Sequence, residues 1–296
     1  MRIPFFLTAT LTVMSCTPAV VAVIPPPVVP AQPPSPAPPQ NTTPANILVL
    51  GDSQISFGAG GAYRSFFSSL GDACPSLPAR YGRAEAAAIG VRSTALHHWT
   101  ASSGSQRGVI CDVDEKFGVN AGAYGVTSPN RTYVQIGQNP DYPFCTPAQS
   151  PLKAVFDAPA YDPDLVVLAF LGNATERWQS ATAARADWQA AERQLPADVA
   201  CLVMTTIPGY DAADNRARTA AQRNLDAAVT ASGRCAFVAG LTPATLAAFE
   251  NNPAYFRTDA AGTVVDPRHP TAASGRAFTN LQSPAICAAL TRILPD

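Results

Sequence analysis

Short runs of apolar residues alternate with longer segments of mixed polarity from about position 45 to the end of the chain. The apolar runs predict buried β-strands at residues 47–51, 84–91, 164–171, 199–207 and 235–240. The segments between them predict helices at residues 64–70, 174–194, 212–229, 242–249 and 271–290. Because strands and helices alternate, the pattern favours a single α/β domain over residues 45–296, with a parallel sheet covered by helices on both faces.

A Gly-Asp-Ser tripeptide that ends at Ser53 directly follows the first predicted strand. Open α/β sheets hold their ligands beyond the carboxyl ends of their strands, so Ser53 stands where a nucleophile is expected. A hydroxyl is a weak nucleophile and needs a neighbouring base. The search for that base is short, because the chain contains three histidines, His97, His98 and His269.

His269 is the strongest candidate for the base, because Asp266 precedes it by three residues in the sequence Asp-Pro-Arg-His-Pro. A carboxylate at this spacing can accept the Nδ1 proton of the imidazole, which leaves Nε2 to take the proton of Ser53. Taken singly, each of the two blocks could be an ordinary surface turn. Their occurrence together and in this order favours a catalytic triad of Ser53, His269 and Asp266.

These two blocks resemble the first and last signature blocks of the SGNH (GDSL-like) hydrolases. The resemblance implies a flavodoxin-like three-layer sandwich with a central, mostly parallel sheet, and ester hydrolysis with Ser53 as nucleophile, His269 as base and Asp266 as the orienting carboxylate. The chain lacks the G-x-S-x-G sequence, which argues against the nucleophile elbow of the α/β-hydrolases.

The same resemblance implies an oxyanion hole. The stretch Gly90-Val-Arg-Ser93 resembles a Gly-x-x-Gly block with a serine at its second glycine. Gly172 and Asn173 resemble a Gly-x-Asn block, but here the two residues are adjacent. The implied donors are the backbone N–H of Ser53, the backbone N–H of Gly90 or Ser93, and the side-chain amide of Asn173. Asn173 is equally well suited to cap the helix that follows it.

Two further segments are irregular in sequence. Residues 57–63 are rich in glycine and predict a flexible loop at the mouth of the site, without the glycine spacing of a nucleotide-binding loop. Residues 102–163 are rich in Gly, Ser, Asn and Pro, with one predicted strand at residues 131–136. A loop of this length is expected to be a functional cover or a stapled insertion.

The N-terminal segment predicts export. Residues 1–16 form a short apolar run after Arg2, typical of a signal peptide and too short to span a bilayer. Cys16 ends a sequence that resembles a bacterial lipobox, so lipidation at Cys16 is favoured over ordinary secretion. Residues 17–44 then predict a linker, because ten of the chain's 29 prolines lie between Pro25 and Pro44 with no charged residue among them.

If Cys16 is lipidated, six cysteines remain, an even number that suggests disulfides in an oxidising compartment. They are Cys74, Cys111, Cys145, Cys201, Cys235 and Cys287. We expect Cys201 to pair with Cys235, and a second bridge among Cys74, Cys111 and Cys145 to staple the irregular region. The chain has neither a C-x-x-C nor an H-E-x-x-H sequence, so no metal and no cofactor is expected.

The composition of the chain limits the classes of binding partner that can be expected. The net charge is −1 and 14% of the residues are charged, which favours neither nucleic acid nor an anionic membrane surface. The sequence therefore predicts an exported serine esterase of the bacterial cell envelope, or a secreted one. Because of that location, we favour as its substrate a small ester or an O-acylated, above all O-acetylated, polysaccharide. The alternatives are an acyltransferase with the same triad, a lipase or thioesterase, and a non-catalytic glycan-binding envelope protein. Membrane contact is expected only through a lipid anchor.

Overall fold

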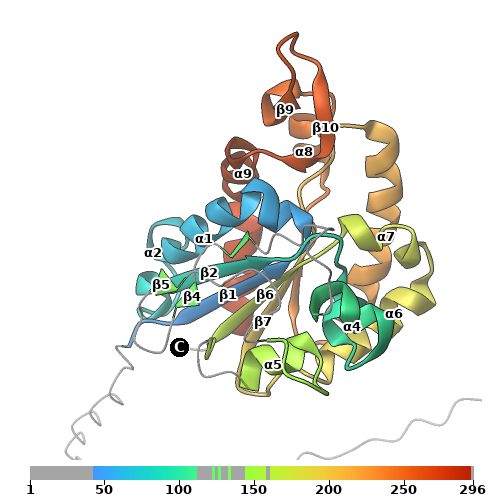
Figure 1. Ribbon diagram of the computed structural model, residues 1–296. Coiled ribbons are helices and arrows are strands. Elements are labelled where there is room, and N and C mark those ends of the chain that lie inside the picture. The colour runs from blue at the N-terminus through green and yellow to red at the C-terminus, as the bar shows by residue number, and fades with distance from the viewer. Residues whose placement is uncertain are drawn as a thin grey trace, which may run out of the picture. The chain divides into compact units, whose positions relative to one another are not determined.

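The centre of the domain is a six-stranded sheet, seen in the computed structural model with the strand order β3-β2-β1-β6-β7-β8 (Figure 1). The structure describes residues 43–111, 122–123, 126–127, 133–134, 144–157 and 161–294. All neighbouring strands of this sheet run parallel except the edge strand β3, which pairs antiparallel with β2. The strands are β1 (Asn46–Gly51), β2 (Glu85–Gly90), β3 (Gly122–Ala123), β6 (Leu165–Ala169), β7 (Ala200–Met204) and β8 (Ala236–Val238).

The central strands are buried on both faces, which explains why their sequences are almost continuously apolar. In β6 every residue of the sequence LVVLA is buried. The register aligns Gly51 of β1 with Gly90 of β2 and Ala169 of β6. The three strands therefore end at the same level, and the segments that follow them meet at one edge of the sheet.

Helices cover both faces of the sheet, which gives the three-layer α/β arrangement that the sequence predicts (Figure 1). One face is covered by α1 (Gly60–Ser68), α2 (Leu70–Ala73) and α9 (Ala272–Ile293). The other is covered by α3 (Leu96–Thr100), α4 (Gly104–Cys111), α5 (Pro151–Asp157), α6 (Ala181–Glu192) and α7 (Ala212–Ser232). Within the described residues, no helix is long and apolar enough to cross a membrane.

The remaining elements are short. Helix α8 (Pro243–Phe249) packs beside α9, and β9 (Phe256–Thr258) pairs antiparallel with β10 (Val264–Pro270) in a hairpin that stands out from the layers (Figure 1). A second small sheet joins β4 (Val126–Thr127) to β5 (Tyr133–Val134), and β5 is the described part of the strand predicted at residues 131–136. Single helical turns form η1 (Ile55–Ala59), η2 (Tyr81–Arg83), η4 (Gly172–Ala174), η5 (Arg177–Gln179) and η6 (Pro253–Tyr255).

Two predictions about local structure were wrong. The glycine-rich run at residues 57–63 is helical, in η1 and the first turn of α1, and it is no loop. Gly58 has a φ of 155°, and a Cβ there would lie 3.1 Å from the carbonyl oxygen of Pro270. The absence of a side chain at Gly58 therefore allows η1 to pack closely against the backbone at Pro270. The helix predicted at residues 174–194 is divided into η4, η5 and α6, because Ser180 adopts an extended conformation and caps α6.

Residues Asn41–Asp296 form one compact unit. The signal peptide at residues 1–16, the lipidation site Cys16 and residues 17–42 of the linker lie outside the described residues. Export, lipid anchoring and the domain boundary at residue 45 stay predictions.

Three disulfides join the cysteines of the domain. The predicted pair Cys201–Cys235 is present. Cys111 pairs with Cys145, which staples the irregular region as expected. Cys74, the third candidate for that staple, pairs instead with Cys287 on α9, 213 residues later in the sequence. Helices α2 and α9 lie on the same face of the sheet, which brings these two cysteines together.

Candidate active site

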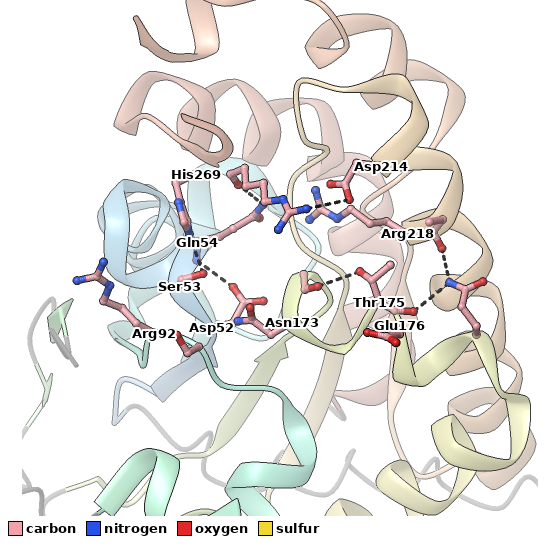
Figure 2. Close-up of a pocket in the computed structure, with 15 residues that line it drawn as sticks. Asp52, Ser53, Gln54, Arg92, Asn173, Thr175, Glu176, Asp214, Arg218 and His269 are labelled. Atoms are coloured by element: carbon pink, nitrogen blue, oxygen red, sulfur yellow. Dashed lines mark hydrogen bonds and ion pairs between the residues drawn. The ribbon is translucent and has the colours of Figure 1, made fainter. Parts of the chain in front are cut away.

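Ser53 and His269 meet at the carboxyl edge of the sheet. Ser53 is the second residue after β1, and His269 lies near the end of β10. The Oγ of Ser53 lies 3.0 Å from Nε2 of His269, although 216 positions separate the two residues (Figure 2). A hydroxyl and an imidazole at this distance can exchange a proton.

Asp266 holds the other nitrogen of the imidazole. Both of its carboxylate oxygens lie 3.0 Å from Nδ1 of His269, and its Oδ1 also accepts the backbone N–H of His269 at 3.1 Å. The structure thus brings Ser53, His269 and Asp266 into one hydrogen-bonded chain. This is the geometry in which a serine hydroxyl is activated, and the catalytic role of the three residues stays a prediction.

Arg257 is a partner of Asp266 that the sequence analysis missed. It faces Asp266 in the register of the β9–β10 hairpin and forms an ion pair with Oδ2 of the carboxylate. Burial by itself would raise the pKa of Asp266, but the hydrogen bonds from Arg257 and His269 together hold that pKa below its ordinary value. A sequence signal existed, because an Arg and an Asp flank a turn that contains Gly262.

Asp52 stabilises the turn that carries Ser53. Its side chain is 1% exposed and accepts the backbone N–H of Gln54 at 2.9 Å, and its backbone carbonyl accepts from Ile55 at 3.1 Å. Burial raises the pKa of Asp52, whereas the hydrogen bond from Gln54 and the nearby Arg218 act in the opposite direction. The Gly-Asp-Ser tripeptide therefore contributes a buried acceptor that fixes the backbone beside the nucleophile.

The four residues expected at the oxyanion hole do not all reach the site. Ser53, Ser93 and Asn173 line the pocket in front of His269, whereas Gly90 does not. Gly90 is buried in β2, where a Cβ would lie 2.3 Å from the backbone nitrogen of Ser56, so close packing explains this glycine. Of the two alternative backbone donors, Ser93 lines the pocket and has a left-handed φ of 60°, and its role as an oxyanion donor stays a prediction.

Asn173 does not cap a helix. It lies in η4, and its Nδ2 donates to the backbone carbonyl of Thr94 at 2.9 Å. The side chain therefore joins the segment after β6 to the segment after β2, at the wall of the pocket (Figure 2).

The pocket has a volume of about 650 Å³. Most of the residues that line it have polar or charged side chains (Figure 2). Among the described residues, the lining contains no large apolar side chain and consists of Asp52, Ser53, Gln54, Arg92, Ser93, Gly172, Asn173, Thr175, Glu176, Gln179, Asp214, Ala217, Arg218, Arg268 and His269. Arg218 is 2% exposed and donates to Thr206 and to the carbonyl of Ile207. Burial lowers the pKa of Arg218, and the nearby Asp214 and Asp52 raise it.

The other two histidines lie away from this pocket. His97 and His98 of α3 lie with ring centroids 3.9 Å apart and ring planes tilted by 40°, and Nδ1 of His97 lies 3.7 Å from the carboxylate of Asp187. Burial lowers the pKa of both rings, to about 4 for His98. Among the described residues, no three His, Cys, Asp or Glu side chains gather as they would around a metal ion.

Comparisons with known proteins give likenesses of fold. No protein-family model matches the chain, and no curated protein matches it. The catalytic domain of peptidoglycan O-acetyltransferase A from Streptococcus pneumoniae superimposes with a TM-score of 0.41 and 14% identity, over 84% of this chain and 94% of that one.

Two further solved structures are similar over much of this chain. A salicylyl-acyltransferase from a tetracycline biosynthetic pathway has a TM-score of 0.44 and 12% identity, over 86% of this chain. A family two carbohydrate esterase from Clostridium thermocellum, in complex with cellohexaose, has a TM-score of 0.39 and 14% identity, over 84% of this chain. This chain spans 57% and 66% of their respective lengths.

Proposed function

We propose that this protein is a serine esterase of the SGNH type that hydrolyses a small carboxylic ester. The observation that carries the proposal is the hydrogen-bonded chain from Ser53 through His269 to Asp266, with its serine end open to the pocket. The Gly-Asp-Ser and Asp-Pro-Arg-His-Pro blocks that resemble the family supply these residues.

In the proposed reaction, the Oγ of Ser53 attacks the ester carbonyl while Nε2 of His269 takes its proton. Asp266, held by Arg257, stabilises the imidazolium that forms. Collapse of the tetrahedral intermediate breaks the bond to the alcohol oxygen, which receives the proton from His269. A water molecule then attacks the acyl group on Ser53 in the same manner, and the products are a carboxylic acid and the free serine.

The negative charge of the tetrahedral intermediate needs hydrogen-bond donors that are already in place. We assign this role to the backbone N–H groups of Ser53 and Ser93 and to the side-chain amide of Asn173. All three residues line the pocket beside the nucleophile.

Most of the described residues around the pocket carry charged, hydroxyl or amide groups, and these favour a short acyl group on a hydroxyl-rich alcohol, such as an O-acetylated carbohydrate. A long acyl chain would gain little binding free energy here. Burial of a methylene group contributes about 0.8 kcal/mol, and a methylene group that stays in water does not make this contribution. This disfavours the lipase alternative. The lining groups do not distinguish water from a sugar hydroxyl as the acyl acceptor, so an acyltransferase is the second candidate.

The proposed location is the extracytoplasmic side of the cell envelope. Three disulfides support it, because such bonds persist in oxidising compartments. Cleavage directly before Cys16 and lipidation of Cys16 belong to the same proposal. Metabolic labelling with a radioactive fatty acid tests the lipid anchor, since Cys16→Ala would lose a label that the parent chain carries.

Turnover of p-nitrophenyl acetate by the wild-type protein and by Ser53→Ala tests the esterase. We expect Ser53→Ala to lose about three to six orders of magnitude in kcat. Equal rates for the two proteins would contradict the proposal and favour a non-catalytic binding protein. Product analysis with added acceptor sugars separates the two enzymes: a transferase forms a new sugar ester, and an esterase releases only free acid.

A further inference from the structure

The side chain of Gln54 joins the turn that carries the nucleophile to the segment that carries the base. Its Nε2 donates to the backbone carbonyl of Arg268 at 3.0 Å and to that of Ile207 at 3.1 Å. These acceptors lie 214 and 153 positions away in the sequence. The amide group of the residue that follows Ser53 thus donates both of its hydrogens to segments that are distant in the sequence.

The two segments that Gln54 binds are also bound to each other. The backbone N–H of Tyr210 donates to the carbonyl of Pro267 at 2.8 Å, and Asn215 fixes Gly209 with two hydrogen bonds of 2.7 and 2.8 Å. The carbonyls of Pro267 and Arg268, the two residues before His269, are therefore both held. The first is held by the main chain, and the second by Gln54.

The position of Gln54 is costly for a residue that serves stability alone. The side chain is 4% exposed, and within the described part of the chain its Oε1 has no hydrogen-bond partner. A buried acceptor without a partner lowers the free energy of unfolding. The amide offsets this cost only through its two donated hydrogen bonds, which connect the segments of Ile207 and Arg268 to the turn of Ser53.

We propose that Gln54 is a positioning residue, whose amide sets the distance between Ser53 and His269. This inference rests on the proposed esterase function, because it assigns a task within the same site. Proton transfer requires the Oγ of Ser53 and Nε2 of His269 to stay within hydrogen-bonding reach. Loss of the bond to Arg268 releases the backbone directly before the base, and a misplacement of about 1 Å can cost about 100-fold in rate.

The test compares two buried glutamines whose side-chain amides each donate to two backbone carbonyls, one at the proposed active site and one outside it. Gln282 is 3% exposed, and its Nε2 donates to the carbonyls of Ala239 and Gly240 at 2.9 and 3.4 Å, outside the pocket lining. Gln54→Met and Gln282→Met therefore remove matching pairs of hydrogen bonds with little change of volume. We expect Gln54→Met to lower kcat for p-nitrophenyl acetate about 10- to 100-fold with KM within about twofold, and Gln282→Met to keep kcat within about twofold.

A second readout needs no turnover. The Nδ1 proton that His269 shares with Asp266 is observable by NMR and is assigned by its loss in His269→Gln. We expect this resonance to broaden or shift in Gln54→Met and to stay unchanged in Gln282→Met. If wild type and Ser53→Ala turn over equally, the esterase proposal fails, and the resonance alone decides whether Gln54 positions the imidazole.

The remaining outcomes are also decisive. An active enzyme in which Gln54→Met keeps the wild-type kcat and the wild-type resonance overturns the inference and leaves the esterase intact. Equal losses of kcat in Gln54→Met and Gln282→Met overturn it too, because the effect is then one of general stability. If Gln54→Met does not fold, Gln54→Asn, which keeps the donors on a shorter side chain, is judged by the same two readouts.

Discussion

The side-chain amide of Asn173 donates to the backbone carbonyl of Thr94 at 2.9 Å and thereby joins the segments that follow β6 and β2. Gly51, at the end of β1, lies between these two strands in the register of the sheet. An amide nitrogen carries two hydrogens, and among the described residues only Thr94 takes one from Asn173. We propose that the second hydrogen meets the negative charge that develops beside Ser53.

Asn173→Ala tests this role. We expect kcat to fall about 100- to 1,000-fold, the usual cost of removing one oxyanion donor, with a small change in KM. Asn252 is a matched control: its Nδ2 donates to the carbonyl of Ala248 at 2.9 Å, and neither residue lines the pocket. Asn252→Ala should keep its kcat. Similar kcat values for wild type and Asn173→Ala would remove Asn173 from the mechanism.

Arg257→Met tests the support of the carboxylate. The folded protein lowers the pKa of Asp266, so this carboxylate contributes stability above the ordinary carboxyl pKa and loses that contribution as the pH falls through the lowered pKa. Without Arg257 the pKa of Asp266 rises, and activity should begin to fall at a higher pH.

The measurement is kcat/KM from about pH 3 to about pH 6, around the ordinary carboxyl pKa, with circular dichroism at each pH to show that the protein stays folded. Arg276→Met, at an exposed arginine of α9, serves as the control and should follow the wild-type profile. An unshifted acid limb in Arg257→Met would show that Arg257 does not tune Asp266.

Ser93→Gly should stabilise the protein and leave it active. Ser93 has a φ of 60°, a left-handed conformation that costs a non-glycine residue about 1–2 kcal/mol. Glycine adopts it freely and keeps the backbone N–H that we assign to the oxyanion hole. Urea denaturation should show a gain of about 1 kcal/mol. Ser102→Gly, at an exposed serine outside the positive-φ region, should give no gain; a destabilised or inactive Ser93→Gly would mean that the hydroxyl itself is needed.

The bridge between Cys74 and Cys287 should stabilise the fold without affecting the chemistry. It closes a sequence separation of 213 residues, and neither cysteine lines the pocket. The double variant Cys74→Ser with Cys287→Ser should lose about 2–5 kcal/mol of unfolding free energy in chemical denaturation. Below the unfolding transition its kcat should match that of the wild type. A large loss of kcat in a fully folded double variant would disagree with this division between stability and catalysis.

The elements that sequence predicts well here are those with local signals. The strands are recognisable in the sequence as apolar runs, and Asp266 and His269 are close in the chain as well as in space. Gln54 and Cys74 could not be assigned in this way, because their partners, Arg268 and Cys287, come more than 200 residues later and no local pattern specifies them.

Glycine was the least informative residue when read locally. Residues 57–63 look like a flexible loop by composition, yet they lie in helical segments on both sides of a kink at Gly58. The φ of 155° at this glycine permits η1 to approach Pro270. Gly90 was one of two residues that the motif offered as an oxyanion donor, and tight packing against Ile55 and Ser56 accounts for the glycine without that role. In both cases the reason for the glycine is a neighbour that only the folded chain supplies.

The central claim is that Ser53 is a nucleophile activated by His269, and covalent labelling tests it most directly. The full-length protein is treated with a fluorophosphonate probe, and the modified residue is mapped by peptide mass spectrometry. We predict one modified serine, Ser53, with labelling strongly slowed in His269→Gln and absent in Ser53→Ala. A folded wild-type protein that takes up no label, or takes it up on another residue, would contradict the account.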